Sequence, residues 1–247
     1  MKVEIKPVGN RRELKQFVAL PAKFHKNHLN WVPPIYIDDL EYFDPKSNSQ
    51  FEGCDYVLVL AYVNGEVVGR CMGLIHHAYN QRHSELDARF CYIETANEPG
   101  VFEALITYIS NWARQLGMKR LVGPLGFSDK DPQGFLFAGY DEPVAIATNC
   151  NHPYMNRLVE NLNFEKLVDL VVYKIDIPPT LPEVYTKVNE RFIRNNSDIR
   201  TLEFISRRKV RPYIRPVLTL INKTFTDIYG FTPFTPKEMD HFANRYL

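Results

Sequence analysis

The chain has 247 residues, of which 45% are hydrophobic and 24% are charged. This composition is that of a globular protein with a buried core, and it excludes an intrinsically disordered chain. Thirty basic residues balance twenty-nine acidic residues to give a formal net charge of +1, so the sequence predicts no nucleic-acid partner and no membrane-surface partner.

The spacing of apolar residues predicts several strands in the first 177 positions. They cover residues 2–8, 56–63, 67–76, 89–95, 119–125 and 170–177. Asn64-Gly65 separates the second strand from the third and is typical of a two-residue hairpin turn. Apolar residues at helical spacing predict a helix from Val101 to Leu116, which Gly117 ends. Because this helix connects the strands at 89–95 and 119–125, those two strands should run parallel.

Further helices and one long loop complete this part of the chain. Asn10 can cap a helix that starts at Arg11, and Pro21 should kink or end that helix. A short helix is predicted over residues 154–162. The connection over residues 126–150 is long for a compact domain, and loops of this length usually carry function.

A proline-rich linker over residues 177–183 divides the chain, and the pattern then begins again. We predict a helix over 183–194, a strand over 199–205, a helix over 213–227 and a helix from Pro236. A shift of 200 positions places Ile5 on Ile205, Arg11 on Arg211, Phe17 on Val217, Trp31 on Phe231 and Pro33 on Pro233. These matches predict an incomplete second copy of the fold over residues 184–247, with coincidence as the alternative. Its apolar face should pack on the first domain or on a partner, or the segment belongs to a longer chain.

The order of these elements resembles the GNAT (Gcn5-related) N-acetyltransferase superfamily over residues 1–176. The central segment that carries the resemblance is RFCYIETANEPGVFEALITYISNWARQLGMKRLVGP. Gly69-Arg70, Gly123-Pro124 and the stretch from Phe24 to Pro34 are similar to a group of uncharacterised bacterial tandem-GNAT-like proteins. The resemblance implies an α/β fold with a mixed, mostly antiparallel central sheet and flanking helices, plus a partial second copy at the C-terminus.

In this superfamily the strands before and after the long helix splay apart to form a cleft for acyl-CoA. The resemblance implies that acetyl-CoA or another acyl-CoA is the acyl donor. Free N–H groups and the positive dipole end make the start of the helix a site for the diphosphate. The positions so implied are Ile93, Glu94 and Thr95 for the pantetheine and Gly100, Val101 and Phe102 for the diphosphate.

Two features depart from the superfamily pattern. The usual phosphate loop is Gln/Arg-x-x-Gly-x-Gly/Ala, whereas Asn97, Glu98 and Pro99 lead into the helix here. Pro99 removes a donor, and Glu98 places a negative charge where the diphosphate would lie. The tyrosine that protonates the leaving thiolate in many members corresponds to Val159. Tyr154 lies more than one turn away from that position, so we expect its hydroxyl to point elsewhere.

Glu94 is a carboxylate at the end of an otherwise apolar strand, and a buried acid beside a cleft can be the general base for an amine. The alternative is a strand-end carboxylate that bonds to backbone or solvent. His25 and His28 are three residues apart and can share a helix face, but no carboxylate stands at ligand spacing from them. We therefore expect no metal site.

The cysteines and the N-terminus predict the compartment. No C-x-x-C pair occurs among the four cysteines, which are Cys54, Cys71, Cys91 and Cys150. The N-terminus has no signal-like apolar stretch, and the sequence has no run of about 18 apolar residues. These features predict a cytoplasmic protein without a membrane span.

Two functions stay open. The first is an acyl-CoA-dependent N-acyltransferase that moves an acetyl group to a small-molecule amine, with Glu94 as its catalytic base. The second is a non-catalytic GNAT-like binding or structural module whose acyl-CoA site is degenerate, as the departures at the phosphate loop and the tyrosine position favour. Homo-oligomerisation and intramolecular packing of the C-terminal segment also both stay open.

Overall fold

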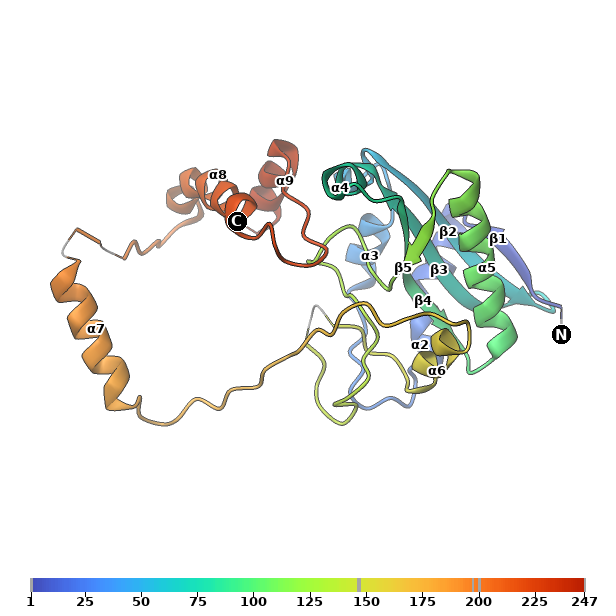
Figure 1. Ribbon diagram of the computed structural model, residues 1–247, viewed down its shortest axis with the longest axis horizontal. Coiled ribbons are helices and arrows are strands. Elements are labelled where there is room, and N and C mark those ends of the chain that lie inside the picture. Colours follow the sequence, from blue (N-terminus) through green and yellow to red (C-terminus); the bar gives the residue numbers. More distant parts are fainter. Residues whose placement is uncertain (1, 146–147, 197, 200, 247) are drawn as a thin grey trace.

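The computed structural model describes residues 2–145, 148–196, 198–199 and 201–246. Its centre is a five-stranded sheet in the order β1-β2-β3-β4-β5 (Figure 1). The strands are β1 (Glu4–Pro7), β2 (Cys54–Val63), β3 (Glu66–His76), β4 (Asp87–Thr95) and β5 (Arg120–Val122). The first four strands pair antiparallel and β5 runs parallel to β4. The mixed, mostly antiparallel sheet expected from the sequence is thereby confirmed.

Helices α5 (Pro99–Gln115) and α1 (Arg11–Ala19) pack on opposite faces of the sheet. The other described helices are α2 (Pro21–Phe24), α3 (Tyr36–Tyr42), α4 (His77–His83), α6 (Tyr154–Glu160), α7 (Glu183–Asn195), α8 (Arg207–Thr224) and α9 (Pro236–Tyr246), with a 3-10 turn at Ser49–Phe51. Successive side chains of a strand point to opposite faces. Val59 and Ala61 of β2 therefore pack in the core formed with α5, whereas Leu58 and Leu60 pack in the core formed with α1. No described helix has the length and apolarity that a bilayer crossing needs.

Local sequence signals placed the β2–β3 turn and the start of α1 correctly, whereas α8 begins at Arg207, six residues before the predicted start at Tyr213. Asn64 and Gly65 both have positive φ, at 51° and 82°, which is the backbone of a type I′ hairpin turn between β2 and β3. The Asn10 side chain accepts from the backbone N–H groups of Arg12 and Glu13, each at 3.0 Å, and so caps α1. A new helix, α2, begins at Pro21, as the kink prediction required.

Strands β4 and β5 separate soon after they begin. Asp87–Arg89 pair with Arg120–Val122, and β5 ends there, three residues before its predicted end. In the part of the chain that the structure describes, no strand pairs with the second half of β4 on this side. The splaying implied by the GNAT resemblance is therefore present.

A bulge interrupts β4 in the half that pairs with β3 but not with β5. The register between β3 and β4 shifts between Arg70 and Met72, and Tyr92 on β4 has φ of 49°. A bulge adds one residue to a strand and re-aims the side chains that follow it. The bulge and the open edge together set the position of Glu94 at the end of β4.

Two predicted strands are wrong. Residues 170–177 form no strand. The strand predicted over 199–205 is absent from residues 199 and 201–205, and residue 200 lies outside the described residues. Side chains of the first segment are exposed, with Tyr173 and Ile175 both at 82%. Alternating apolar residues favour a strand, but a strand forms only where a neighbour supplies backbone partners. Neither segment has such a neighbour among the described residues.

The C-terminal part leaves the sheet at α7 and then packs on the loop after β5. All residues of α7 are exposed, and Figure 1 places this helix apart from the sheet. The segment after α8 then packs on the loop after β5: Asp129 N donates to Gly230 O at 3.1 Å, and Thr232 Oγ1 donates to Phe127 O at 3.1 Å. Intramolecular packing of the C-terminal segment therefore occurs in this chain.

Two helix boundaries in the C-terminal part match boundaries in the N-terminal part when the numbering is shifted by 200 residues. Helix α8 ends at Thr224 and α2 ends at Phe24, while α9 begins at Pro236 and α3 begins at Tyr36. The strand that should precede α8 is missing from the described residues, so a second copy of the fold stays a prediction.

Candidate active site

Glu94 lies directly opposite Arg70 of β3 in the antiparallel register. The Glu94 side chain is 18% exposed, whereas Arg70 is buried and donates from Nη1 to the Phe17 carbonyl oxygen at 2.8 Å. Burial lowers the pKa of Arg70, and the negative charge of Glu94 opposes that effect. The sheet therefore holds a carboxylate beside a buried cation at the open end of β4.

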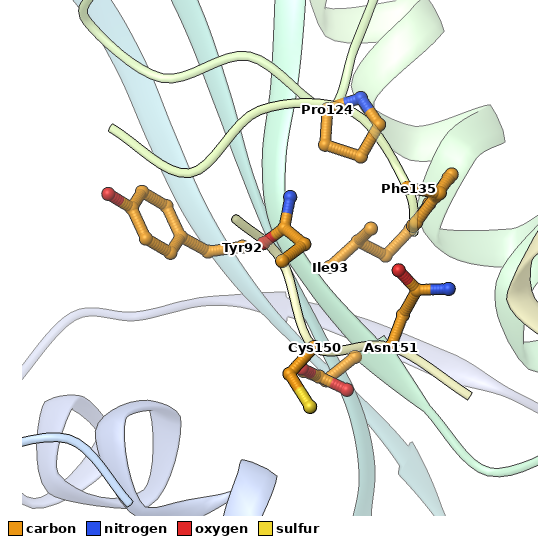
Figure 2. Close-up of a pocket in the computed structure, with 8 residues that line it drawn as sticks. Tyr92, Ile93, Pro124, Phe135, Cys150 and Asn151 are labelled. Atoms are coloured by element: carbon orange, nitrogen blue, oxygen red, sulfur yellow. The ribbon is translucent and has the colours of Figure 1, made fainter. Parts of the chain in front are cut away.

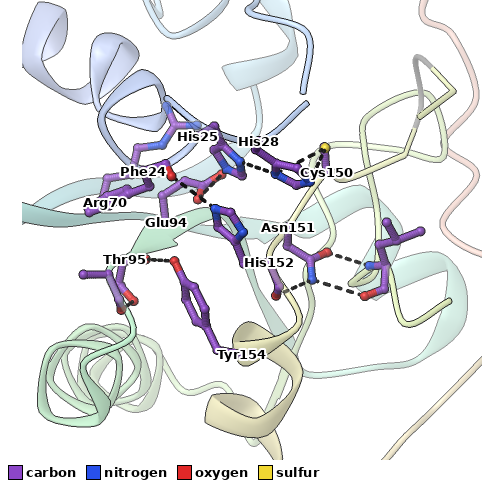
Figure 3. A network of polar contacts seen from close by, with 12 residues as sticks. Phe24, His25, His28, Arg70, Glu94, Thr95, Cys150, Asn151, His152 and Tyr154 are labelled. Atoms are coloured by element: carbon purple, nitrogen blue, oxygen red, sulfur yellow. Dashed lines mark hydrogen bonds and ion pairs between the residues drawn. The ribbon is translucent and has the colours of Figure 1, made fainter. Parts of the chain in front are cut away.

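His25 approaches the same carboxylate from the loop after α2 (Figure 3). Its Nε2 lies 3.4 Å from Glu94 Oε2, and its Nδ1 lies 2.9 Å from Nδ1 of His28. The turn that brings the two rings together is closed by a hydrogen bond from His28 N to His25 O at 3.0 Å. The His25 side chain is fully buried, so Glu94 contacts a shielded imidazole rather than solvent on this side.

A third histidine, His152, joins this pair from the segment before α6. Its ring stacks on His25 with centroids 4.8 Å apart and on His28 with centroids 4.6 Å apart. His152 Nε2 lies 3.1 Å from the Phe24 carbonyl oxygen, which fixes the ring orientation. One ring nitrogen from each of the three histidines lies within 4.8 Å of the others. We call His25, His28 and His152 the histidine cluster.

The surroundings favour the neutral imidazole of His28 and the protonated thiol of Cys150. Burial lowers the pKa of His28, and the charges of His152 and His25 lower it further, against the opposing effect of Glu94. Cys150 Sγ lies 4.0 Å from His28 Nδ1 and 3.9 Å from His28 Nε2. Burial raises the pKa of the Cys150 thiol and Glu94 raises it further, so the sulfur is not an activated thiolate.

Tyr154 corrects one expectation from the sequence. Its hydroxyl does not point elsewhere but donates to the Thr95 carbonyl oxygen at 2.8 Å, at the end of β4. Burial, with a smaller effect of Glu94, raises the pKa of Tyr154 to about 12. The spacing between Tyr154 and Val159 did not predict this contact. Tyr154 is the first residue of α6, and its ring stacks on that of the preceding His152. A protonated phenol therefore lies at the end of β4, next to Thr95.

A small cavity of about 20 Å³ lies between the open edge of β4 and the long loop (Figure 2). It is lined by Tyr92, Ile93, Glu94, Pro124, Phe135, Asn149, Cys150 and Asn151. Such a cavity has room for about one water molecule. Asn151 fastens the loop here, because its Oδ1 accepts from Leu136 N at 2.6 Å. Side chains of the loop thus close the cleft next to Ile93 and Glu94.

The start of α5 has Glu98 as its N-cap residue, and Pro99 is the first helical residue. The backbone N–H groups of Val101 and Phe102 both bond to the Glu98 carbonyl oxygen, at 3.0 and 3.3 Å.

The three residues assigned to the diphosphate differ in accessibility. Val101 and Phe102 have buried side chains, and Gly100 is exposed. Their role in diphosphate binding stays a prediction, with Gly100 as the accessible member.

The structure brings together some site residues that sequence reasoning named and others that it did not. Ile93, Glu94 and Thr95 lie at one end of β4, as expected. The residues added by the fold are His152, Tyr154, Cys150 and Arg70. The spacing of His25 and His28 was a usable signal. Their third partner, His152, could not be predicted from the sequence, because it follows the long loop and no sequence pattern places that loop over α2.

Comparison with known proteins gives two curated relatives. The chain is 29% identical over 238 residues to a bacterial ceramide synthase of Caulobacter vibrioides, covering 96% of this chain and 61% of that protein. It is 24% identical over 237 residues to the protein YghO of Escherichia coli K12, covering 93% of this chain and 58% of that protein. The chain therefore spans about three fifths of the length of these relatives. No protein-family model matches it.

Similar solved structures are acyl-transfer proteins. A tandem GNAT protein from the clavulanic acid biosynthesis pathway has a TM-score of 0.39 at 18% identity, covering 51% of this chain and 38% of that one. An aminoglycoside acetyltransferase from an uncultured soil sample has a TM-score of 0.45 at 12% identity, covering 70% and 97%. The element order of the chain, with a parallel β5 after a helical crossover, is the order that the GNAT resemblance implies. The fold is GNAT-like.

Proposed function

We propose that the chain carries the catalytic site of an N-acyltransferase, which transfers an acyl group from acyl-CoA to an amine. One observation carries the proposal: Glu94 lies at the end of β4 beyond the pairing with β5, opposite Arg70 in the β3–β4 register and with its carboxylate 3.4 Å from His25 Nε2. The backbone beside it is the edge to which a pantetheine arm would bind. A carboxylate at that point can accept a proton from an acceptor ammonium group.

The reaction forms a carbon–nitrogen bond and breaks a carbon–sulfur bond. Glu94 accepts one proton from the ammonium group, and the neutral amine then attacks the thioester carbon. The Tyr154 hydroxyl is protonated at neutral pH, since its pKa is about 12, and it gives its proton to the departing CoA thiolate. The second proton of the attacking nitrogen restores Tyr154. The products are the amide, the CoA thiol and a protonated Glu94.

The surface next to the site suits an acceptor with an apolar chain. Leu29, Val32 and Ile35 follow the histidine pair and are 99%, 77% and 69% exposed. Asn30 Nδ2 donates to the Tyr140 carbonyl oxygen at 2.9 Å, which holds this apolar rim against the long loop. Exposed apolar residues grouped beside a site favour an apolar ligand. The name of the ceramide synthase relative supports a long-chain amino alcohol as the acceptor.

The acyl donor requires a wider cleft than the structure has. A cavity of about 20 Å³ cannot hold a pantetheine arm. Phe135, Asn149 and Cys150 would have to move away from β4 for Ile93 and Thr95 to pair with the donor. We therefore propose that the long loop opens when acyl-CoA binds.

The second candidate is a GNAT-like module that binds no acyl-CoA. The observation that favours it is the start of α5, where Glu98 and Pro99 precede the amides of Val101 and Phe102 that already bond within the helix. In this case the fold would serve packing alone, and Glu94 would be a structural partner of Arg70.

Calorimetric titration separates the two candidates. We expect acetyl-CoA or a long-chain acyl-CoA to bind to the protein, and CoA thiol to be released when a long-chain amino alcohol is added. A short amine such as ethanolamine should give a higher KM than the long-chain acceptor, because it cannot contact the apolar rim. No heat at millimolar acyl-CoA, both in this chain and in any longer form of the protein, would favour the non-catalytic module.

A further inference from the structure

We propose that His25, His28 and His152 form a binding site for one divalent transition-metal ion of the zinc type. This site goes beyond the acyl-transfer function, and nothing in that function requires it. The three histidines come from two segments far apart in the sequence, yet one ring nitrogen from each lies within 4.8 Å of the others (Figure 3). Three imidazoles are a ligand set that Zn²⁺ uses in proteins.

Contacts of Nε2 in His25 and in His152 leave the Nδ1 atom of each ring available to the cluster. His25 Nε2 contacts the Glu94 carboxylate at 3.4 Å, and His152 Nε2 contacts the Phe24 carbonyl oxygen at 3.1 Å. Metal-binding histidines typically donate their other N–H to a carboxylate or a backbone carbonyl, which fixes the tautomer. This leaves Nδ1 of His25 and Nδ1 of His152 unprotonated and able to bind a metal.

His28 completes the set through its own Nδ1. That atom lies 2.9 Å from His25 Nδ1, so one of the two nitrogens carries a shared proton in the metal-free protein. Zinc–nitrogen bonds of about 2.0–2.1 Å at tetrahedral angles place ligand nitrogens roughly 3.3 Å apart. Binding therefore needs small ring rotations that widen the 2.9 Å pair and bring nitrogens near the 4.8 Å limit closer together. It also needs the transfer of that proton to His28 Nε2 or to solvent.

Packing holds the rings in place before a metal arrives. His25 stacks between Trp31, at 5.2 Å between centroids, and His152, at 4.8 Å. The ring planes are nearly parallel, with interplanar angles of 11° and 7°. A cluster that is already assembled loses little side-chain entropy when it binds an ion.

The fourth coordination position faces Cys150, whose Sγ lies 4.0 Å from His28 Nδ1. Water or this sulfur can occupy it. Imidazole ligands select ions such as Zn²⁺, Co²⁺ and Ni²⁺ over Mg²⁺, which prefers oxygen ligands. The proposed ligand is therefore a transition-metal ion and not an alkaline-earth ion.

Cobalt titration tests the site without any substrate. Chelator-treated protein should bind one Co²⁺ per chain with the visible absorption bands of a tetrahedral complex, and Zn²⁺ should displace it. His28→Asn and His152→Asn should each weaken binding by roughly 100-fold or more, because each removes one ligand. The matched control is His83→Asn, an exposed histidine on α4, which should leave the titration unchanged.

Two further results decide the proposal even if a variant fails to fold. Zn²⁺ should raise the melting temperature of the chelator-treated wild-type protein, and Mg²⁺ should not. Absence of both the cobalt spectrum and the zinc-dependent shift would overturn the site, as would equal affinity in the folded His28→Asn and His152→Asn proteins. Neither readout measures acyl transfer, so failure of the metal site leaves the proposed function standing, and the reverse also holds.

Discussion

Arg70 on β3 and Glu94 on β4 are direct cross-strand partners, which places a buried guanidinium beside the carboxylate at the open end of the sheet. Arg70 also lies over the Phe17 ring at 5.0 Å and bonds to the Phe17 carbonyl oxygen. The Arg70 guanidinium is thereby held in place by α1 as well as by the sheet. We therefore expect that removing either charge affects the other.

Replacing Arg70 tests this coupling. Arg70→Met should lower the free energy of unfolding by about 1–3 kcal/mol, because it removes the hydrogen bond to the Phe17 carbonyl oxygen and the cation opposite Glu94. Glu94→Gln in the same protein should restore part of the loss, with a coupling energy of about 0.5–3 kcal/mol. Urea denaturation measures both, with Arg114→Met on the exposed face of α5 as the control. Additive effects of the two substitutions would contradict the coupling.

Tyr154 should matter for turnover more than for stability. Tyr154→Phe removes the proposed acid and one hydrogen bond to Thr95, so we expect kcat to fall by about 10²-fold and the free energy of unfolding by about 1 kcal/mol. Tyr185→Phe on α7, where the residue is 62% exposed, is the matched control. An unchanged kcat in Tyr154→Phe would assign the proton to another donor.

The stability of the protein should depend on pH through His76. Burial is the main cause that lowers the pKa of His76 to about 4 from an ordinary value of 6.5, with Arg89 as the next cause. A lowered native pKa means that stability present above pH 6.5 is lost as the pH falls toward 4.

Substitution of His76 measures this contribution. His76 caps α4, and His76→Asn keeps a side chain that can accept from Tyr79 N. It should flatten the decline in unfolding free energy between pH 6.5 and 4 by roughly 1–3 kcal/mol, since one pKa unit corresponds to 1.36 kcal/mol. His83→Asn should leave the decline unchanged. An equally steep decline in His76→Asn would show that other groups cause it.

Gly123 stands where the chain leaves β5 and cannot carry a side chain. A Cβ there would lie 2.2 Å from the Phe90 carbonyl oxygen, which is backbone of β4 and cannot rotate away. Gly123→Ala should therefore cost more than about 3 kcal/mol or prevent folding. Gly65→Ala also places Ala at positive φ but meets no atom within 4 Å, and should cost about 1 kcal/mol. Equal melting temperatures for the two variants would contradict the role of the close contact.

The sequence predicted the parts of the fold whose signals are local. The Asn64-Gly65 turn, the Asn10 cap and the periodic apolar face of α5 each depend on residues close together in the chain, and the structure confirms all three. The strand prediction over residues 170–177 was wrong because strand formation depends on a neighbouring strand, which the local pattern cannot reveal.

The GNAT resemblance implied Ile93, Glu94 and Thr95 as cleft positions, and the structure places them at the end of β4. Their role in binding and catalysis stays a prediction. The histidine cluster depends on the long loop, which carries Cys150 and leads to His152 over α2. Loop placement is set by contacts such as Asn151 with Leu136, and such contacts have no periodic signature in sequence.

The most direct test of the proposed function is the amide product formed by wild-type protein and by Glu94→Gln, measured by mass spectrometry with a long-chain acyl-CoA and a long-chain amino alcohol. We predict amide from the wild-type protein and a fall in kcat of about 10²- to 10⁴-fold in Glu94→Gln, because the proton acceptor is lost. Glu103→Gln, an exposed carboxylate on α5, should retain the wild-type rate. Equal rates in folded Glu94→Gln and Glu103→Gln proteins would contradict the assignment of the base, and absence of amide in all three would contradict the acyltransferase itself.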